Sequence, residues 1–139
     1  MNTDKDTNAL ENIEAADPVY LEQELTGKIL ECAFVVHNTL GAGFLERVYS
    51  NALALELRRS EIECAREVPL KVTYKGVIVG DYVADILVAG RVLIELKACA
   101  VLDSNHAAQI MNYLRASGIR VGLLLNFGRP KLEYRRFVC

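Results

Sequence analysis

The segment 77–97, VIVGDYVADILVAGRVLIELK, decides the fold because a short turn around Gly90 separates two apolar runs. Both runs are rich in valine, isoleucine and leucine, which is typical of β-strands. A three-residue loop at 89–91, with Gly90 at positive φ, predicts a hairpin in which the numbers of opposed residues add to 180. Asp85 then lies directly opposite Glu95.

Three charged side chains interrupt this otherwise apolar hairpin. Residues two apart on a strand point to the same face, so Lys97 joins Glu95 and Asp85 in one cluster. The neighbouring apolar side chains point to the other face: Ile86, Ile94 and Leu96. Two opposed carboxylates destabilise a hairpin unless a cation compensates, and oxygen ligands suit Mg²⁺ or Mn²⁺. Lys97 is placed to neutralise charge and to help deprotonate a water molecule.

Two alternatives remain open from the hairpin alone. The cluster also fits a salt-bridge group on a solvated sheet face, which is the commoner arrangement for such charges. A two-residue loop in place of the three-residue loop would shift the register by one and separate Asp85 from Glu95.

The sequence before the hairpin predicts two helices and a strand. Apolar residues recur at helical spacing over 25–40 and again over 45–59, on either side of a break that contains Gly41 and Gly43. Alternating apolar and polar residues over 68–75 predict a strand, and Pro69 favours a place near the edge of a sheet.

The sequence after the hairpin predicts a helix between two strands. The helix covers 103–117 and ends at Gly118, and the apolar strand 121–125 that follows should be central and parallel to the strand at 92–98. A more exposed strand at 131–138 completes the order ααβββαββ. We therefore expect an α/β protein of the α+β type, with a mixed central sheet flanked by helices.

The composition indicates one domain, at 25–139, preceded by an acidic tail at 1–24 that we expect to be disordered. Residues 1–25 hold seven acids and one base, which leaves 11 acids and 15 bases, or +4, in the rest of the 139-residue chain. This excess is compatible with a polyanionic partner but is common in other proteins. No signal peptide or membrane span is recognisable, so the protein is expected to be cytoplasmic.

The four cysteines are far apart and lack the spacing of a zinc site, so we interpret them as free thiols, three of them buried. They suggest no chemistry for the site.

Asp85, nine intervening residues and then Glu95-Leu96-Lys97 resemble the D…ExK signature of the PD-(D/E)XK nuclease superfamily. The segment 43–49, GFLERVY, resembles the motif of the GxxExxY proteins, which are usually placed in that superfamily. The likeness runs from Leu25 to Val138 and includes HAAQIMNYLRASG and GLLLNFG. Ala84 stands where the superfamily's name has proline, a position that carries no reacting group.

The resemblance implies a restriction-endonuclease-like core and a metal-dependent nuclease. Asp85 and Glu95 would hold Mg²⁺ or Mn²⁺, and Lys97 would act on the attacking water. Glu46 would be a further metal ligand or an outer carboxylate, although an acid in the first turn of a helix is also favourable by itself.

On the helix at 103–117, Gln109 and Tyr113 resemble the QxxxY motif of exonuclease-type members and would bind the substrate. Without the family context, the two residues fit the polar shoulder of an ordinary amphipathic helix. His106 shares their face but is expected at the helix start and not in the site.

The function predicted from the sequence is hydrolysis of phosphodiester bonds in nucleic acid, DNA or RNA, with no membrane partner. The alternative is a catalytically silent module for nucleic-acid binding or protein interaction on the same fold. The domain is small and only mildly basic, so this alternative relies on a homodimer or a protein partner to hold a duplex.

Overall fold

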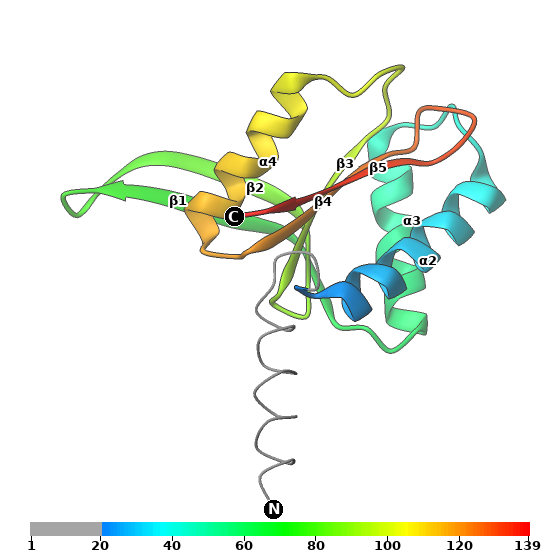
Figure 1. Ribbon diagram of the computed structural model, residues 1–139, viewed down its shortest axis with the longest axis horizontal. Coiled ribbons are helices and arrows are strands. Elements are labelled where there is room, and N and C mark those ends of the chain that lie inside the picture. The colour runs from blue at the N-terminus through cyan, green and yellow to red at the C-terminus, as the bar shows by residue number, and fades with distance from the viewer. Residues whose placement is uncertain (1–20) are drawn as a thin grey trace, which may run out of the picture.

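The computed structural model describes residues 21–139, which form a mixed five-stranded sheet with helices on both faces (Figure 1). The elements follow the predicted order: α2 (Gln23–Leu40), α3 (Glu46–Arg59), β1 (Cys64–Tyr74), β2 (Val77–Val88), β3 (Val92–Lys97), α4 (Ser104–Ser117), β4 (Val121–Asn126) and β5 (Glu133–Val138). The strands lie in the sheet in the order of the chain, and only β3 and β4 are parallel. The expected parallel central strand is therefore confirmed.

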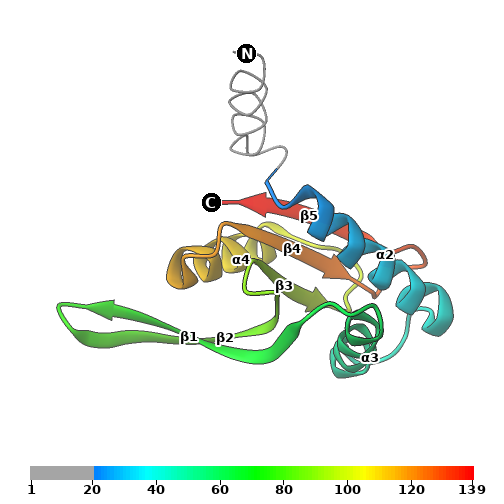
Figure 2. The same cartoon turned by 90° about the horizontal axis from the view of Figure 1, so that it is seen from below.

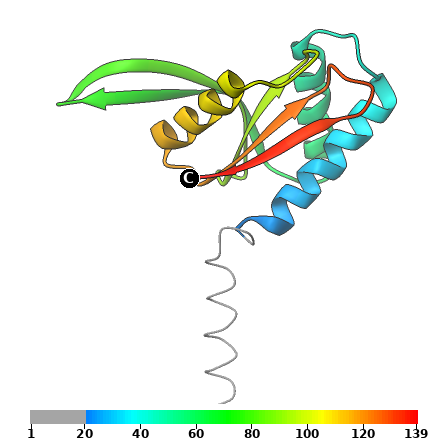
Figure 3. The ribbon, with the colours of Figure 1, turned by 45° about the horizontal axis from the view of Figure 1, so that its top comes forward.

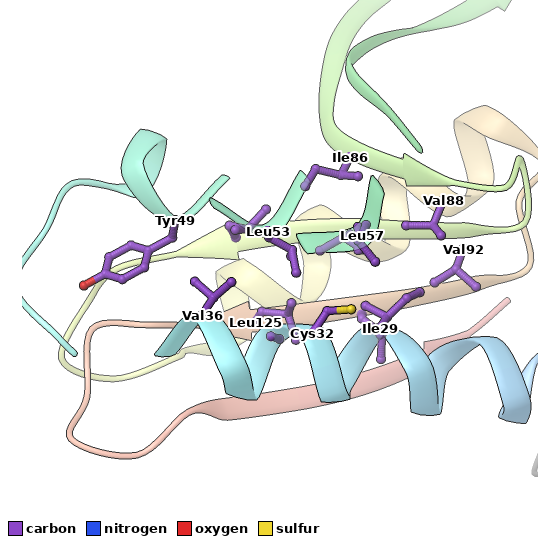
Figure 4. Close-up of a cluster of buried hydrophobic side chains, with 14 of the residues drawn as sticks. Ile29, Cys32, Val36, Tyr49, Leu53, Leu57, Ile86, Val88, Val92 and Leu125 are labelled. Atoms are coloured by element: carbon purple, nitrogen blue, oxygen red, sulfur yellow. The ribbon is translucent and has the colours of Figure 1, made fainter. Parts of the chain in front are cut away.

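Each face of the sheet has its own core. Helices α2 and α3 cover one face and α4 covers the other (Figure 2). Figure 4 shows the larger core, where Ile29, Leu53 and Leu57 of the helices meet Ile86 and Val92 of the sheet. The apolar run in β4 is buried along its whole length because both of its faces are covered.

The helix ends explain why the chain turns where it does. Gly41 follows α2 with φ 70° and donates its N–H to the carbonyl oxygen of His37. Gly118 ends α4 in the left-handed conformation, with φ 74°. At the start of α4, the Asp103 carboxylate accepts the N–H groups of Asn105 and His106, and His106 Nδ1 accepts the N–H of Asp103. His106 therefore caps the helix, as expected.

Strands β1 and β2 form an arm that projects beyond the body of the protein (Figures 1 and 3). Strand β1 is at the edge of the sheet, which agrees with the expectation from Pro69. Large apolar side chains are exposed at the end of the arm and along β2: Tyr74, Val77, Ile78 and Val79 at the end, Tyr82 and Val83 further along the strand. Strand β1 begins at Cys64, four residues before the predicted strand, because Cys64 pairs with Val88 across the sheet.

Three smaller expectations have different outcomes. The acidic tail predicted at 1–24 lies outside the described residues except for its last four, and α2 begins among these, at Gln23. All four cysteines are free, but only Cys32 is buried, so the expectation of three buried thiols is wrong.

Within residues 21–139, no helix combines the length and the apolar character needed to cross a membrane.

Candidate active site

The two predicted carboxylates lie where β2 and β3 separate. The opposed pairs are Ile86 with Ile94, Leu87 with Leu93 and Val88 with Val92, so the predicted register is confirmed, as is the positive φ of Gly90. The backbone ladder stops after the first of these pairs. Beyond it, Asp85 N–H donates to Glu95 Oε1 at 3.1 Å and Leu96 N–H donates to Asp85 Oδ2 at 2.7 Å.

Each carboxylate thus takes the place of a carbonyl acceptor on the opposite strand. The regular pairing of β2 with β3 ends at this point, and the two carboxylates bridge the strands beyond it. The apolar neighbours expected on the opposite face, Ile86, Ile94 and Leu96, all belong to the core under α2 and α3. The hairpin therefore holds two acidic side chains in fixed positions just beyond the last pair of β2 and β3.

Glu95 is the more deeply buried of the two acids, with 3% of its surface exposed. Its pKa is raised from 4.5 to about 8, first by burial and then by the negative charge of Asp85. A hydrogen bond from the Asp85 backbone and the positive charge of Lys97 act in the opposite direction. A divalent cation would remove the repulsion between the two carboxylates, and both offer the oxygen atoms that Mg²⁺ prefers.

Lys97 ends β3, half-buried, beside Asn126 of the parallel strand β4. The chain after Lys97 is fixed by the fully buried amide of Asn126. Asn126 Oδ1 accepts the N–H groups of Cys99 and Gly128, and Asn126 Nδ2 donates to the carbonyl oxygen of Cys99 at 3.0 Å. A Cβ atom on Gly128 would lie 2.6 Å from the carbonyl carbon of Ala98, so this approach requires glycine.

Helix α4 brings Gln109 and Tyr113 to the same side as Glu95. Gln109 Nε2 donates to Tyr113 Oη at 3.0 Å, and the Tyr113 side chain is 7% exposed. The pKa of Tyr113 is raised by burial, then by the negative charge of Glu95, with a smaller effect of Asp85. The raised pKa keeps the tyrosine hydroxyl neutral, so it can act as a hydrogen-bond donor on the side of the sheet where Glu95 lies.

The segment 43–49 joins α2 to α3 through a buried tyrosine. The Tyr49 ring stacks on Phe127 with centroids 4.8 Å apart, and its hydroxyl donates to the carbonyl oxygen of Gly41 and accepts the Phe44 N–H. Gly43 has φ 117°, which side chains rarely tolerate. The glycine and the tyrosine of this segment therefore shape the loop, and Glu46 begins the helix that follows.

A pocket of about 220 Å³ lies between the first turn of α3 and the opening of the hairpin. The carboxylates of Glu46 and Asp85 line it, but Glu46 is exposed and Glu95 does not line it. Among the described residues, no three histidine, cysteine or acidic side chains come together as a metal site. The carboxylates of Asp85 and Glu95 suit a cation by their chemistry. Glu46 shares a pocket with Asp85 but not with Glu95.

The same pocket contains side chains that the sequence did not single out: Arg47, Ser50, Arg66 and Glu67. In the sequence, Arg66 and Glu67 have the pattern of exposed positions on an edge strand. Only the structure shows their place, because Glu67 has φ 51° and interrupts the pairing of β1 with β2 opposite Asp85.

The five-stranded mixed sheet with helices on both faces, opened at an acidic hairpin, is of the restriction-endonuclease-like class. The chain belongs to the PD-(D/E)XK nuclease superfamily, whose family model matches residues 23–137. No curated protein matches the sequence. Among solved structures, the crystal structure of SSO0001 is similar in fold, with a TM-score of 0.54 and 16% sequence identity. The similarity covers 86% of this chain and 60% of SSO0001, so the chain spans less than two thirds of that protein.

Proposed function

We propose that the protein is a metal-dependent nuclease that hydrolyses phosphodiester bonds of nucleic acid. The observation that carries this proposal is the arrangement of Asp85 and Glu95. Each carboxylate is held by a backbone N–H of the other strand, and within residues 21–139 neither forms an ion pair shorter than 4.0 Å. Membership of the PD-(D/E)XK nuclease superfamily supports the same conclusion. The finer GxxExxY assignment rests on the segment 43–49.

Asp85 and Glu95 would hold Mg²⁺ or Mn²⁺, and Glu46 would contribute a further ligand or an outer carboxylate from α3. The cation supplies charge stabilisation and a more acidic water at neutral pH. Lys97, at the end of β3, would orient such a water and help to deprotonate it. Gln109 and Tyr113 would donate hydrogen bonds to the phosphate from α4.

The test is a cleavage assay on single-stranded and double-stranded DNA and RNA with Mg²⁺, Mn²⁺ or EDTA. The full chain should cleave at least one substrate in a metal-dependent manner. Asp85→Ala and Lys97→Ala should each reduce the rate by at least about 100-fold while circular dichroism remains that of the wild type. Asp81→Ala, an exposed acid on the same strand, is the matched control and should cleave normally. Undiminished cleavage by Asp85→Ala would overturn the assignment.

One observation favours the alternative of a silent binding module. The described residues contain no group of three metal-ligating side chains, so the cation would rest on fewer protein ligands than a closed site has. Calorimetric titration of Mn²⁺ into wild-type and Asp85→Asn protein tests this point. A nuclease should bind Mn²⁺ in the wild type and lose that binding in the variant. A silent module should bind an oligonucleotide without cleaving it, in the presence or absence of Mn²⁺.

A further inference from the structure

The pocket beside α3 contains an unusual set of charges. Two guanidinium groups line it, from Arg47 and Arg66, together with three carboxylates, from Glu46, Glu67 and Asp85. Its formal charge is therefore −1. Opposite charges in so small a space normally pair directly, yet in the described part of the chain none of these five side chains forms an ion pair shorter than 4.0 Å.

Arg66 in particular has hydrogen-bonding capacity that the protein does not use. Its Nη2 donates to Ser50 Oγ at 3.1 Å, which fixes the guanidinium against α3. Its Nε is buried and is the one buried side-chain nitrogen or oxygen within residues 21–139 that has no hydrogen-bond partner. A buried donor without a partner is destabilising, so a ligand that draws the guanidinium into a hydrogen bond would offset this cost.

The backbone explains how the guanidinium reaches this place. Arg66 lies opposite Ile86, whose side chain belongs to the core under α2 and α3, so Arg66 is on the same face as α3. The next residue, Glu67, adopts φ 51° and does not pair with Asp85 across the strands. The interrupted ladder therefore places an arginine and two carboxylates at one opening of the sheet.

We propose that Arg66, assisted by Arg47, binds a phosphate of the nucleic-acid strand next to the phosphate that is cleaved. This inference rests on the proposed function and adds two substrate-binding residues to it. Guanidinium groups donate paired hydrogen bonds to phosphate oxygens, and they retain their charge at all relevant pH values. Arg66 has a donor without a protein partner, and Arg47 lines the same pocket with an exposed side chain, so both meet this requirement.

A divalent cation would change the charge that the pocket presents to a phosphate. The five charged side chains that line the pocket sum to −1 and Glu95 adds a fourth carboxylate, so a cation held by Asp85 and Glu95 would bring the whole set from −2 to zero. The cation would thus remove the net negative charge that repels a phosphate from the two arginines. A structural role for the arginines predicts direct pairing with the neighbouring acids instead, which the geometry does not show.

The experiment measures binding of a fluorescent 20-nucleotide DNA strand by anisotropy, in EDTA and in Ca²⁺, with the intact length of the strand verified on a gel. The salt dependence of the Kd reports the number of phosphate contacts, and each lost contact to a single strand lowers the slope by about 0.7. Arg66→Ala and Arg47→Ala should each weaken binding about tenfold and lower the slope by that amount, equally for unrelated sequences. Arg59→Ala, an exposed arginine at the other end of α3, is the control and should leave the slope unchanged.

Further variants separate binding from folding. Arg47 is exposed, so Arg47→Ala tests the inference even if Arg66→Ala unfolds, and Arg66→Lys retains the charge but should recover only part of the affinity because it loses the paired donors. The inference would be overturned if Arg47→Ala had the salt-dependence slope of the wild type and Arg66→Lys had its affinity. If the wild type cleaves and these two values are unchanged, only the inference fails; if binding depends on the arginines without any cleavage, only the catalytic proposal fails. A wild type that neither binds nor cleaves contradicts both.

Discussion

Glu95 shows how a single buried acid links the site to the stability of the fold. Its pKa is raised to about 8, whereas the unfolded chain has the ordinary value near 4.5. Between these two values the folded protein holds a proton that the unfolded chain has lost. The stabilising effect of this proton is complete below pH 4.5 and disappears as the pH rises through about 8.

We therefore expect the metal-free protein to lose stability from pH 5 to pH 8. The free energy of unfolding should fall by up to about 1.4 kcal/mol per pH unit, measured by urea denaturation in EDTA. Glu95→Gln cannot lose a proton and should remove most of this slope. Glu31→Gln, an exposed position on α2, should keep it. The same slope in the wild type and in Glu95→Gln would show that Glu95 does not titrate in this range.

Asn126 fixes the segment that follows Lys97. Besides its bonds to Cys99 and Gly128, its amide donates to Glu133 Oε1 at 3.2 Å, so truncation leaves several buried groups without partners. Asn126→Ala should lower the free energy of unfolding by about 2–4 kcal/mol. Asn51→Ala, at an exposed position, should change it by less than about 0.5 kcal/mol. Urea denaturation of both variants measures the difference, and equal values would contradict the role of the buried amide.

How much of the site the sequence reveals depends on whether the determinants are local. The positions of Asp85 and Glu95 follow from the length of one turn, so counting along the hairpin predicts them. Arg66 and Glu67 depend instead on an irregular pairing between β1 and β2, which has no signature in the sequence around them. Side chains brought together by a defect in a ladder can be found only in the structure.

Among the elements, α4 depends most on close contact with the sheet. Gly122 of β4 lies directly under Ile110 of α4, and a Cβ atom added there would be 2.9 Å from Ile110 Cδ1. The helix that carries Gln109 and Tyr113 therefore approaches the sheet as closely as it does because this strand residue lacks a side chain.

Gly122→Ala should destabilise the protein by about 1–3 kcal/mol, because the added methyl group displaces α4. Ile110→Val removes the Cδ1 atom that the methyl group would meet, so the double variant should be more stable than the sum of the two single changes predicts. Thermal or urea denaturation of the four proteins in this double-mutant cycle measures the coupling. Additive effects would mean that the clash is relieved elsewhere.

The elements themselves are largely predictable, and the exceptions have physical causes. The bounds of β2 and the end of α4 follow from turn glycines and apolar periodicity. The start of β1 does not, because the segment from Cys64 to Glu67 has no clear alternation and becomes a strand through its pairing with β2. Tertiary pairing, and not local preference, determines this boundary.

The described part of the molecule consists of a well-packed body and an arm with little packing against the rest of the protein. Strands β3 and β4 are buried under helices on both faces, whereas the outer half of the arm is a two-stranded ribbon with exposed apolar side chains. Two-stranded ribbons without a covering layer are only marginally stable in water. The arm and the body should therefore differ in how often their hydrogen bonds open.

Hydrogen exchange should reveal this difference. Backbone amides in the outer arm, from about residue 72 to residue 80, should exchange through local opening, whereas those of β3 and β4 should require global unfolding. Addition of a mild concentration of urea should accelerate exchange in β3 and β4 much more than in the outer arm. Equal protection and equal urea dependence in the two regions would show that the arm is as firmly held as the body.

The β2–β3 ladder ends at the pair Ile86 and Ile94, so the outer part of the arm does not pair with β3. The length of the arm can therefore change without changing the pairing of β2 with β3. Residues added or removed in pairs around Lys75 and Gly76 preserve the alternation of faces and leave the short hairpin below Asp85 unchanged. The distance that the arm projects from the body can thus change without rebuilding the acidic pair. In this fold the reach is adjustable, while the position of the two carboxylates stays constant.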